Sequence, residues 1–217
     1  MDISALREEY TREGLQREQL PPNPIDQFTR WFEQARNMKL PEPNAMSLAT
    51  VSASGQPSVR TVLLKYFDEQ GFVFFTNYTS NKAKDIDENP HVALSFLWLG
   101  LERQVLMRGT AEKISRTETV KYFLSRPHGS QLGAWCSDQS SIISSRSILE
   151  LKLDEMKRKF KQREIPVPSF WGGYRVRPHR FEFWQGRPNR LHDRFVYIRQ
   201  EQNEDGQQEW SLDRLAP

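Results

Sequence analysis

One face of an α-helix is the first clear pattern in the chain. Apolar residues recur at steps of three and four between residues 28 and 38, which is the spacing of an amphipathic helix. The stiff segment LPPNP at 20–24 precedes them, with Asn23 as a candidate cap and Pro24 in the first turn. The pattern predicts a helix that begins at Pro24. The residues of its apolar face are Phe28, Trp31, Phe32, Ala35 and Met38.

From about residue 45 the apolar period changes to two, the period of a β-strand. The alternating runs are short, and turn residues such as SGQP and DEQG lie between them, which is typical of hairpins. Strands are expected at 45–53, 59–67, 72–76, 91–98, 104–114, 175–185, 195–200 and 209–213.

Helical patterns interrupt these strands at 80–88, 117–124 and 145–162. Many hairpin strands with a few helices favour a mainly β protein, an antiparallel barrel with flanking helices, over alternating βαβ units. The length of 217 residues suits a single domain, expected at 21–217, after a mobile charged arm or helix at 1–20.

Composition narrows the class of protein. The net charge is only +3, which is too weak for a dedicated nucleic-acid binder, so local basic clusters suited to small anions matter more. Cys136 is the only cysteine, which excludes an internal disulfide and favours a reducing, cytoplasmic location. The charged N-terminus has no signal core, and no apolar run approaches the roughly 18 residues of a membrane span.

Several common catalytic motifs are absent from the sequence. It has no GxGxxG motif, no P-loop and no GxSxG elbow. The four histidines lack the spacing of metal ligands, so no metal site is expected. The serine-rich run at 139–147 suits a loop with a helix cap, or alternatively a set of hydroxyl and backbone N–H groups that hold part of a ligand.

Cations in strand and helix-start positions are candidates for anion binding. Arg60 and Lys65 fall on opposite faces of the expected strand SVRTVLLKYF, either as edge charges that reach water or as two separate anion contacts. Ser80 would cap a helix that carries Lys82 in its first turns. This helix start is either solvated or a phosphate-binding site.

A third candidate is the segment KYFLSRPHGSQ at 121–131. Tyr122 and Arg126 lie four residues apart on an expected helix face, and Ser130 follows a Pro-His-Gly turn. Their side chains are all donors that a phosphate accepts. The alternative is three unconnected polar side chains.

The densest polar stretch is FWQGRPNRLHDRF at 183–195. If residues 190–194 are extended, then Arg190, His192 and Arg194 share one face. Cationic groups on one face repel each other, so a bound anion, an electron-rich ligand or nearby carboxylates must offset them. The residues of the opposite face are Leu191, Asp193 and Phe195.

Taken together, these segments resemble the pyridoxine/pyridoxamine 5′-phosphate oxidase family over about residues 6–217. Ordered matches along a whole chain are far more specific than any single motif. The motifs that carry the resemblance are RTVLLK (60–65), FFTNYTSNKA (74–83), LERQV (101–105), KYFLSRP (121–127), GAWCSDQSS (133–141), PSFWGGYRV (168–176), FWQGRPNRLHDR (183–194) and LDRLAP (212–217).

The resemblance implies an antiparallel FMN-binding split β-barrel that forms a homodimer, with each flavin held between two subunits. It implies helical segments at about 117–162 and a dimerisation and active-site region at 168–217. It also implies oxidation of pyridoxine 5′-phosphate and pyridoxamine 5′-phosphate to pyridoxal 5′-phosphate, the last step of vitamin B6 cofactor synthesis and salvage. O2 then reoxidises the flavin and yields H2O2, and the amine substrate releases ammonia.

The family's contacts are carried over by position. Arg190 and His192 are the expected catalytic pair, and His192 is the better proton acceptor because the pKa of imidazole is about 6.5. Asp193 is then left as a structural partner and Arg187 as a solvated charge. The implied FMN contacts are Arg60, Thr61, Val62, Leu63, Leu64, Lys65, Phe75, Thr76, Asn81, Lys82, Gln104, Gln139, Ser140, Trp184 and Arg194. The implied substrate contacts are Arg7 and Tyr10 of the arm, Lys65, Tyr122, Arg126 and Ser130 at the phosphate, and Arg190, Leu191 and His192 at the ring.

The chain departs from the family pattern at a few positions. Family members often have Tyr-Thr in place of Phe75-Thr76 and Arg-Lys in place of Asn81-Lys82, so Asn81 lacks one cation for the flavin phosphate. Glu8 replaces a basic residue of some members. The alternatives to an oxidase are a non-catalytic flavin-binding split barrel and a flavin reductase. An RNA-binding barrel would need a basic, aromatic stacking surface.

Overall fold

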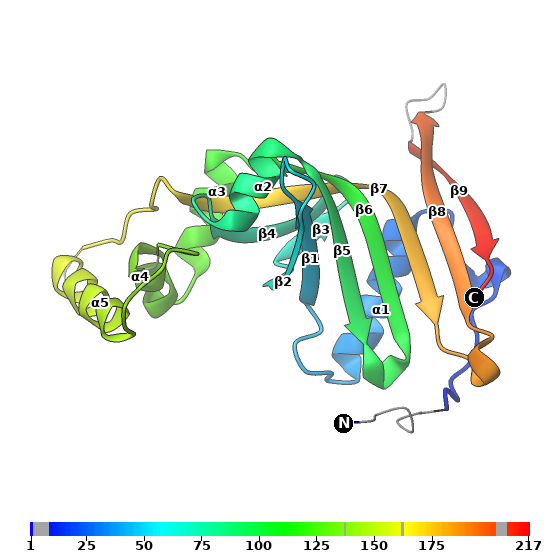
Figure 1. Ribbon diagram of the computed structural model, residues 1–217. Helices are drawn as coiled ribbons and strands as arrows, with labels where there is room; N and C mark the ends of the chain where they lie inside the picture. The colour runs from blue at the N-terminus through cyan, green and yellow to red at the C-terminus, as the bar shows by residue number, and fades with distance from the viewer. Residues whose placement is uncertain (2–8, 137, 162, 203–207) are drawn as a thin grey trace.

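An antiparallel sheet forms the centre of the protein, in a computed structural model that describes residues 1, 9–136, 138–161, 163–202 and 208–217. The nine strands found in these residues follow the order β2-β1-β5-β6-β7-β4-β3, and β8 and β9 branch from β7. The sheet curls as a half-barrel, with α1 against it (Figure 1). The mainly β antiparallel fold expected from the sequence is therefore confirmed.

The strands are β1 (Ala45–Val51), β2 (Pro57–Leu63), β3 (Tyr66–Asp68), β4 (Gly71–Asn77), β5 (His91–Trp98), β6 (Arg103–Lys113), β7 (Trp171–Gln185), β8 (Asp193–Gln202) and β9 (Gln208–Leu215). The helices are α1 (Pro24–Asn37), α2 (Asn81–Glu88), α3 (Arg116–Ser125), α4 (His128–Cys136) and α5 (Ser147–Lys159). Single 3-10 turns are η1 (Arg17–Gln19), η2 (Leu99–Leu101) and η3 (Pro188–Arg190).

Helix α1 covers the inner face of the sheet. It begins as predicted, with the Asn23 side chain accepting the Ile25 N–H group at 2.9 Å and Pro24 in the first position. Phe28 is fully buried, and its ring contacts Phe72 and Phe96 with centroids 4.9 and 5.0 Å apart. Phe28, Trp31, Phe32 and Ala35 of the predicted stripe pack in or against the main core, whereas Met38 follows the helix and is 45% exposed.

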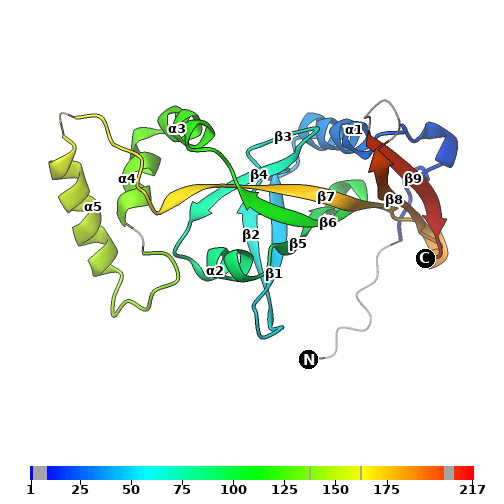
Figure 2. The same ribbon diagram turned by 90° about the horizontal axis from the view of Figure 1, so that it is seen from above.

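Strand β7 joins two ends of the molecule. Figures 1 and 2 both place α4 and α5 beyond the start of β7, and β8 and β9 at its far end. A second apolar cluster, which includes Phe123, Leu132, Met156 and Trp171, holds α3, α4 and α5 together at the first end. β7 has 15 residues. At roughly 3.3 Å for each residue its ends lie some tens of ångströms apart.

The expected strand 59–67 is wrong, because the chain changes partner within it. The Leu64 N–H group bonds to the Asn44 carbonyl at 2.9 Å, beside β1, whereas the Lys65 N–H group bonds to the Val73 carbonyl of β4 at 2.9 Å. β2 therefore ends at Leu63, and a separate short strand β3 begins at Tyr66.

The residue patterns did not predict helix α4, since residues 127–129 suggested only a turn, although α4 falls within the helical range of about 117–162 that the resemblance implies. Gly129 and Gly133 lower the helix propensity of this segment. Pro127 instead initiates the helix, because its carbonyl accepts the N–H groups of Ser130 and Gln131 at 2.8 and 3.1 Å. None of the helices in the described ranges is long and apolar enough to cross a membrane.

Candidate functional site

A cavity of about 920 Å³ opens between β2, β4, α2, α3 and α4. We call it the cationic hollow, because Arg60, Lys65, Lys82 and Arg126 all line it and the described lining residues include no carboxylate. Such a charge excess attracts anions. The other predicted contact residues that line the cationic hollow are Thr61, Val62, Leu63, Phe75, Thr76, Asn81, Tyr122, Ser130, Gln139 and Ser140.

Arg60 and Lys65 line the same cavity, although they were expected on opposite faces of one strand. β2 ends at Leu63 and the Lys65 N–H group bonds to β4, so strand alternation does not place Lys65. Two hydrogen bonds hold the Arg60 side chain: its Nη1 atom donates to the Thr50 hydroxyl at 2.7 Å and to the Leu48 carbonyl at 3.1 Å. Leu64 does not line the hollow but is buried in the main core.

Lys82 is the most buried of the four cations, with 8% of the residue exposed. Its ammonium group donates to Gln139 at 3.0 Å, Thr76 at 3.2 Å and Ser80 at 3.3 Å. Burial, and to a smaller extent the charge of Arg60, lowers the pKa of Lys82 to about 8. An anion beside this group would stabilise its charged form.

The start of α2 lies at the same wall of the hollow. Ser80 is the N-cap residue, but its hydroxyl donates to the Asn77 carbonyl and does not cap the helix. The hydroxyl of Ser140 reaches in from the serine-rich segment and accepts the Asn81 N–H group at 3.3 Å. Ser140 has a φ of 76°, a left-handed conformation that is rare outside glycine. The serine-rich run therefore contributes to the cavity in addition to forming a loop.

An aromatic stack forms a second wall of the hollow. The Tyr122 ring lies 3.9 Å from that of Phe75, which in turn lies 5.2 Å from Trp171. The Arg126 guanidinium lies 4.7 Å from the Trp171 ring, and burial lowers its pKa. Its Nη1 atom is buried without a hydrogen-bond partner in the described part of the chain. An unpaired buried donor of this kind fits an anion, because leaving it unpaired is costly. Trp171 is a lining residue that the sequence patterns did not single out.

The remaining predicted contact residues lie at the other end of β7. Gln104, Trp184 and Arg194 stand side by side on β6, β7 and β8 in register. The His192 ring lies 4.6 Å from the Trp184 ring. We call Gln104, Trp184, Arg190, His192 and Arg194 the hairpin group. Within one chain, the hairpin group therefore lies away from the cationic hollow.

The expected extended segment 190–194 is wrong at its start. Asn189 and Arg190 have φ values of 57° and 61°, and η3 occupies Pro188–Arg190, so β8 begins only at Asp193. Arg190 is therefore not placed by strand alternation. Arg194 instead donates to the Glu182 carboxylate at 2.7 Å, which is the neutralisation that a cluster of cations requires.

The hydrogen bonds of His192 also alter the expected role of its ring. Its Nδ1 atom accepts the backbone N–H group of Arg187 at 3.1 Å. Burial, followed by the charge of Arg190, lowers the pKa of His192 and favours the neutral ring. With Nδ1 as acceptor, the proton of that neutral ring belongs on Nε2. His192 is thus arranged to donate a hydrogen bond to a ligand through Nε2.

Asp193 joins three segments behind the hairpin group, which confirms it as a structural partner. Its carboxylate bonds to Arg214 at 2.6 Å and to the Leu15 N–H group at 3.0 Å, and lies 3.7 Å from Arg187. Arg187 was expected to be a solvated charge, and this is wrong. Its Nη1 atom also donates to the Arg12 carbonyl at 3.0 Å.

The described part of the N-terminal arm packs over the hairpin group. The Tyr10 ring contacts those of Trp184 and His192, each with a centroid distance of 5.7 Å. The Glu102 carboxylate, another contributor that the sequence patterns missed, accepts the N–H groups of Thr11 and Arg12 at 3.2 Å each. Arg7, the other predicted arm contact, lies outside the described residues.

Gly186→Ala is expected to displace this arm. A Cβ atom at Gly186 would lie 2.7 Å from the Tyr10 ring, a distance that real Cβ contacts essentially never show. The arm should therefore detach more often, and trypsin should cleave after Arg12 several-fold faster, since cleavage follows the open population. Gly129→Ala, which meets nothing within 4 Å, is the control. Equal cleavage rates in the two variants would contradict the docking.

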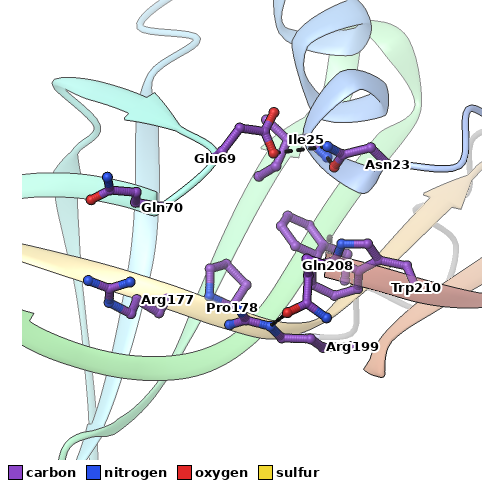
Figure 3. Close-up of a pocket in the computed structure, with 10 residues that line it drawn as sticks. Asn23, Ile25, Glu69, Gln70, Arg177, Pro178, Arg199, Gln208 and Trp210 are labelled. Carbon is purple, nitrogen blue, oxygen red and sulfur yellow. Dashed lines mark hydrogen bonds between the residues drawn. The ribbon is translucent and has the colours of Figure 1, made fainter. Parts of the chain in front are cut away.

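A second cavity, of about 390 Å³, lies between the start of α1 and strands β8 and β9 (Figure 3). Its polar side chains satisfy one another: Asn23 bonds to Glu69 at 2.9 Å, Arg199 to Gln208 at 2.5 Å, and Arg177 to Glu112 outside the cavity at 2.6 Å. None of the predicted contact residues lines it. The cationic hollow, with its unpaired donor, is the better candidate site.

Comparison with known proteins decides the family. The family model described as pyridoxamine 5′-phosphate oxidase matches residues 32–160, and the model of the pyridoxine 5′-phosphate oxidase C-terminal dimerisation region matches residues 171–217. The chain belongs to the pyridoxine/pyridoxamine 5′-phosphate oxidase family. Relatives of this name in Crocosphaera subtropica and Aliarcobacter butzleri are 67% and 59% identical, each over 100% of both chains.

Two solved structures share the fold. PhzG from Burkholderia lata 383, in complex with tetrahydrophenazine-1-carboxylic acid, is 28% identical with a TM-score of 0.84, over 92% of this chain and 95% of that one. A related FMN-binding protein of Nostoc punctiforme is 20% identical with a TM-score of 0.69, over 90% and 98% of the two chains. At that identity the second likeness concerns the fold alone.

Proposed function

We propose that the protein is an FMN-dependent oxidase of pyridoxine 5′-phosphate and pyridoxamine 5′-phosphate, which it converts to pyridoxal 5′-phosphate with O2 as the electron acceptor. The products are H2O2 and, from the amine, ammonia. The observation that carries this proposal is that the hollow holds two groups of cationic hydrogen-bond donors, each of which can bind an anion. In one group, besides burial, the nearby charge of Arg60 contributes to the lowered pKa of Lys82. In the other group, besides burial, the nearby charge of Arg126 contributes to the lowered pKa of Lys65. Two such groups suit a flavin phosphate and a substrate phosphate.

The residues of the hollow fit FMN. Lys82, Arg60 and the start of α2 would hold its phosphate, because a helix N-terminus and buried cations both favour an anion. Thr61, Val62 and Leu63 line the hollow along the edge strand β2 and would lie against the flavin. Asn81 is exposed at the first position of α2, and its backbone N–H group already donates to Ser140 at 3.3 Å, so a phosphate there would replace the Ser140 hydroxyl as its acceptor.

The second group of donors would anchor the substrate. Lys65, Tyr122, Arg126 and Ser130 line one part of the hollow, and the buried Nη1 atom of Arg126 still lacks a partner among the described residues. A phosphate held there would fix the position of the substrate ring. Holding two reactants in register supplies a large part of the rate enhancement of many enzymes.

A second copy of the chain would complete the site. The outer face of the sheet carries Val59, Leu97 and Ile198, which are 70%, 54% and 42% exposed. Register places them on the same face as Gln104, Trp184 and Arg194. Covering this apolar face with a second subunit would bring the hairpin group of one copy to the hollow of the other. The dimerisation region at 171–217 supports a homodimer of this kind.

The chemistry of the step divides between cofactor and protein. Bound FMN would accept the hydride that leaves the C4′ atom of the substrate. Arg190 would orient the C4′ hydroxyl or amine group as a permanent cation, since an arginine does not deprotonate in proteins. His192 would donate a hydrogen bond from Nε2 to the same group, with Nδ1 held by the Arg187 N–H group, and the proton that this group loses as the hydride leaves would pass to solvent water.

Anaerobic reduction of the flavin tests the proposed function. The purified protein should be yellow and should bleach when pyridoxine 5′-phosphate is added without O2, and colour should return with O2. A non-catalytic flavin-binding barrel would stay yellow, and a flavin reductase would bleach with a different donor only. A colourless protein that takes up no FMN would rule the proposal out.

The pH dependence of FMN affinity tests the role of Lys82. Its pKa of about 8 in the free protein means that Lys82 loses its charge above that pH, while a bound phosphate would keep it protonated. Binding then takes up a proton, so affinity should fall as pH rises above 8, by up to about tenfold for each pH unit. Fluorescence titration between pH 7.5 and 9.5 measures it. Lys82→Gln should abolish the slope, and the exposed Lys84→Gln should keep it. A slope that survives in Lys82→Gln would contradict the assignment.

A further inference from the structure

Glu182 is a buried carboxylate within the hairpin region that neither the sequence patterns nor the family contacts single out. It lies on β7 between the core residues Phe181 and Phe183, but its side chain is on the outer face of the sheet, and the residue is only 7% exposed. One carboxylate oxygen, Oε1, accepts from Arg194 Nε at 2.9 Å and from Arg194 Nη2 at 2.7 Å. The other, Oε2, accepts from Arg180 Nη2 at 3.1 Å.

The charges around Glu182 do not cancel. Strand register places Arg108 opposite Arg180, and Arg194 opposite Trp184, all on the outer face that carries Glu182. Two guanidinium groups, those of Arg180 and Arg194, therefore bond to one carboxylate, and the exposed Arg108 lies on the same face. An ion pair placed only for stability would balance its charges, because buried excess charge is costly. The remaining positive charge is free to meet an anionic or electron-rich ligand.

The Arg194 guanidinium is fixed from two sides. Glu182 takes the edge formed by Nε and Nη2, and the Ala216 carbonyl accepts from Nη1 at 2.7 Å. The two N–H groups on this edge share the single oxygen Oε1, and together with the bond from Nη1 they hold the guanidinium at three of its nitrogen atoms. The side chain has thus lost its rotamer freedom before any ligand arrives, which is the condition for tight binding.

We infer that Glu182 is the positioning residue for Arg194, and that it orients this guanidinium toward the flavin bound in the hollow of the second subunit. The inference rests on the proposed function. Glu182 itself touches no ligand and acts through Arg194. Its carboxylate also offsets the repulsion between Arg180 and Arg194, which would otherwise turn the Arg194 head group away from its neighbour.

A double-mutant cycle on FMN affinity tests this inference. Glu182→Gln keeps the shape and one acceptor but removes the charge, and should raise the Kd of FMN about tenfold, as loss of an outer-shell partner does at other sites. In an Arg194→Ala background the same change should alter the Kd by less than about twofold, because Glu182 has nothing left to position. Glu112→Gln is the matched control and should leave the Kd unchanged. It removes the carboxylate of Glu112 on β6 from an exposed ion pair with Arg177 on β7.

Each other outcome has a defined meaning. An equal rise in Kd in both backgrounds, or no rise in the parental background, overturns the positioning role and leaves Glu182 as a structural ion pair. If Glu182→Gln does not fold, Glu182→Asp keeps the buried charge on a shorter side chain, and the same cycle applies to it. The proposed function fails separately, when the parental protein itself binds no FMN or does not bleach with pyridoxine 5′-phosphate.

Discussion

Mixing two impaired variants, Arg126→Ala and Arg190→Ala, is expected to restore about one quarter of the parental oxidase activity at a substrate concentration well below KM, given sites shared across a two-fold dimer. Arg126 lies in the cationic hollow, and Arg190 lies beyond the far end of β7. In a mixed dimer one site combines both altered halves and the other combines both unaltered halves. Random exchange makes about half of the dimers mixed, each with one intact site of two.

Two differently tagged variants, refolded together, allow this measurement. Co-purification of the tags shows that subunits have exchanged, and the doubly tagged fraction, which contains only mixed dimers, should then have about half of the parental activity. The control mixture pairs Arg126→Ala with Lys65→Ala, both in the hollow, and should recover nothing because every site has a damaged hollow. No recovery in the first mixture after proven exchange would show that each site is built from one chain. Recovery in the control would show that Arg126 and Lys65 of one chain do not serve the same site.

The parts of the fold that depend on local pattern could be predicted from the sequence. The bounds of β5, His91–Trp98, agree with its run of alternating residues, and α1 begins at Pro24 as its cap and apolar steps indicate. Both patterns depend only on residues that lie close together in the sequence. The family resemblance supplied the residues that line the hollow, since no single motif among them was specific.

The errors lie where distant hydrogen bonds override a local pattern. The alternation of residues 59–67 continues through Leu64 and Lys65, but their N–H groups bond to Asn44 and Val73, so the strand ends at Leu63 and its alternation does not place Lys65. Likewise, no pattern signals the positive φ of Arg190. The pairing of Glu182 with Arg194 depends on the register of β7 and β8, which becomes known only when the strands are assembled.

Loss of the Arg126 side chain is expected to lower kcat/KM for pyridoxine 5′-phosphate by about 100-fold, because one or two charge-assisted hydrogen bonds of about 1.5–3 kcal/mol each are removed. The buried Nη1 atom has no partner in the described chain, so the guanidinium has a donor available for the phosphate. Most of the loss should be in KM, since the phosphate is far from the reacting carbon and its contacts change little during the step.

Pyridoxine without a phosphate separates anchoring from a general effect on the fold. If Arg126 acts on the phosphate, the Arg126→Ala variant and the parental protein should oxidise free pyridoxine at similarly low rates, while they differ strongly with the phosphorylated substrate. Lys121→Ala, an exposed position on the same helix α3, should behave as the parent with both substrates. Arg126 also packs on Trp171 at 4.7 Å, so an equal loss with both substrates would assign it to the support of the aromatic wall. Arg126→Lys, which keeps a charge but not the planar fork, should then fall between parent and alanine variant only if the phosphate contact is real.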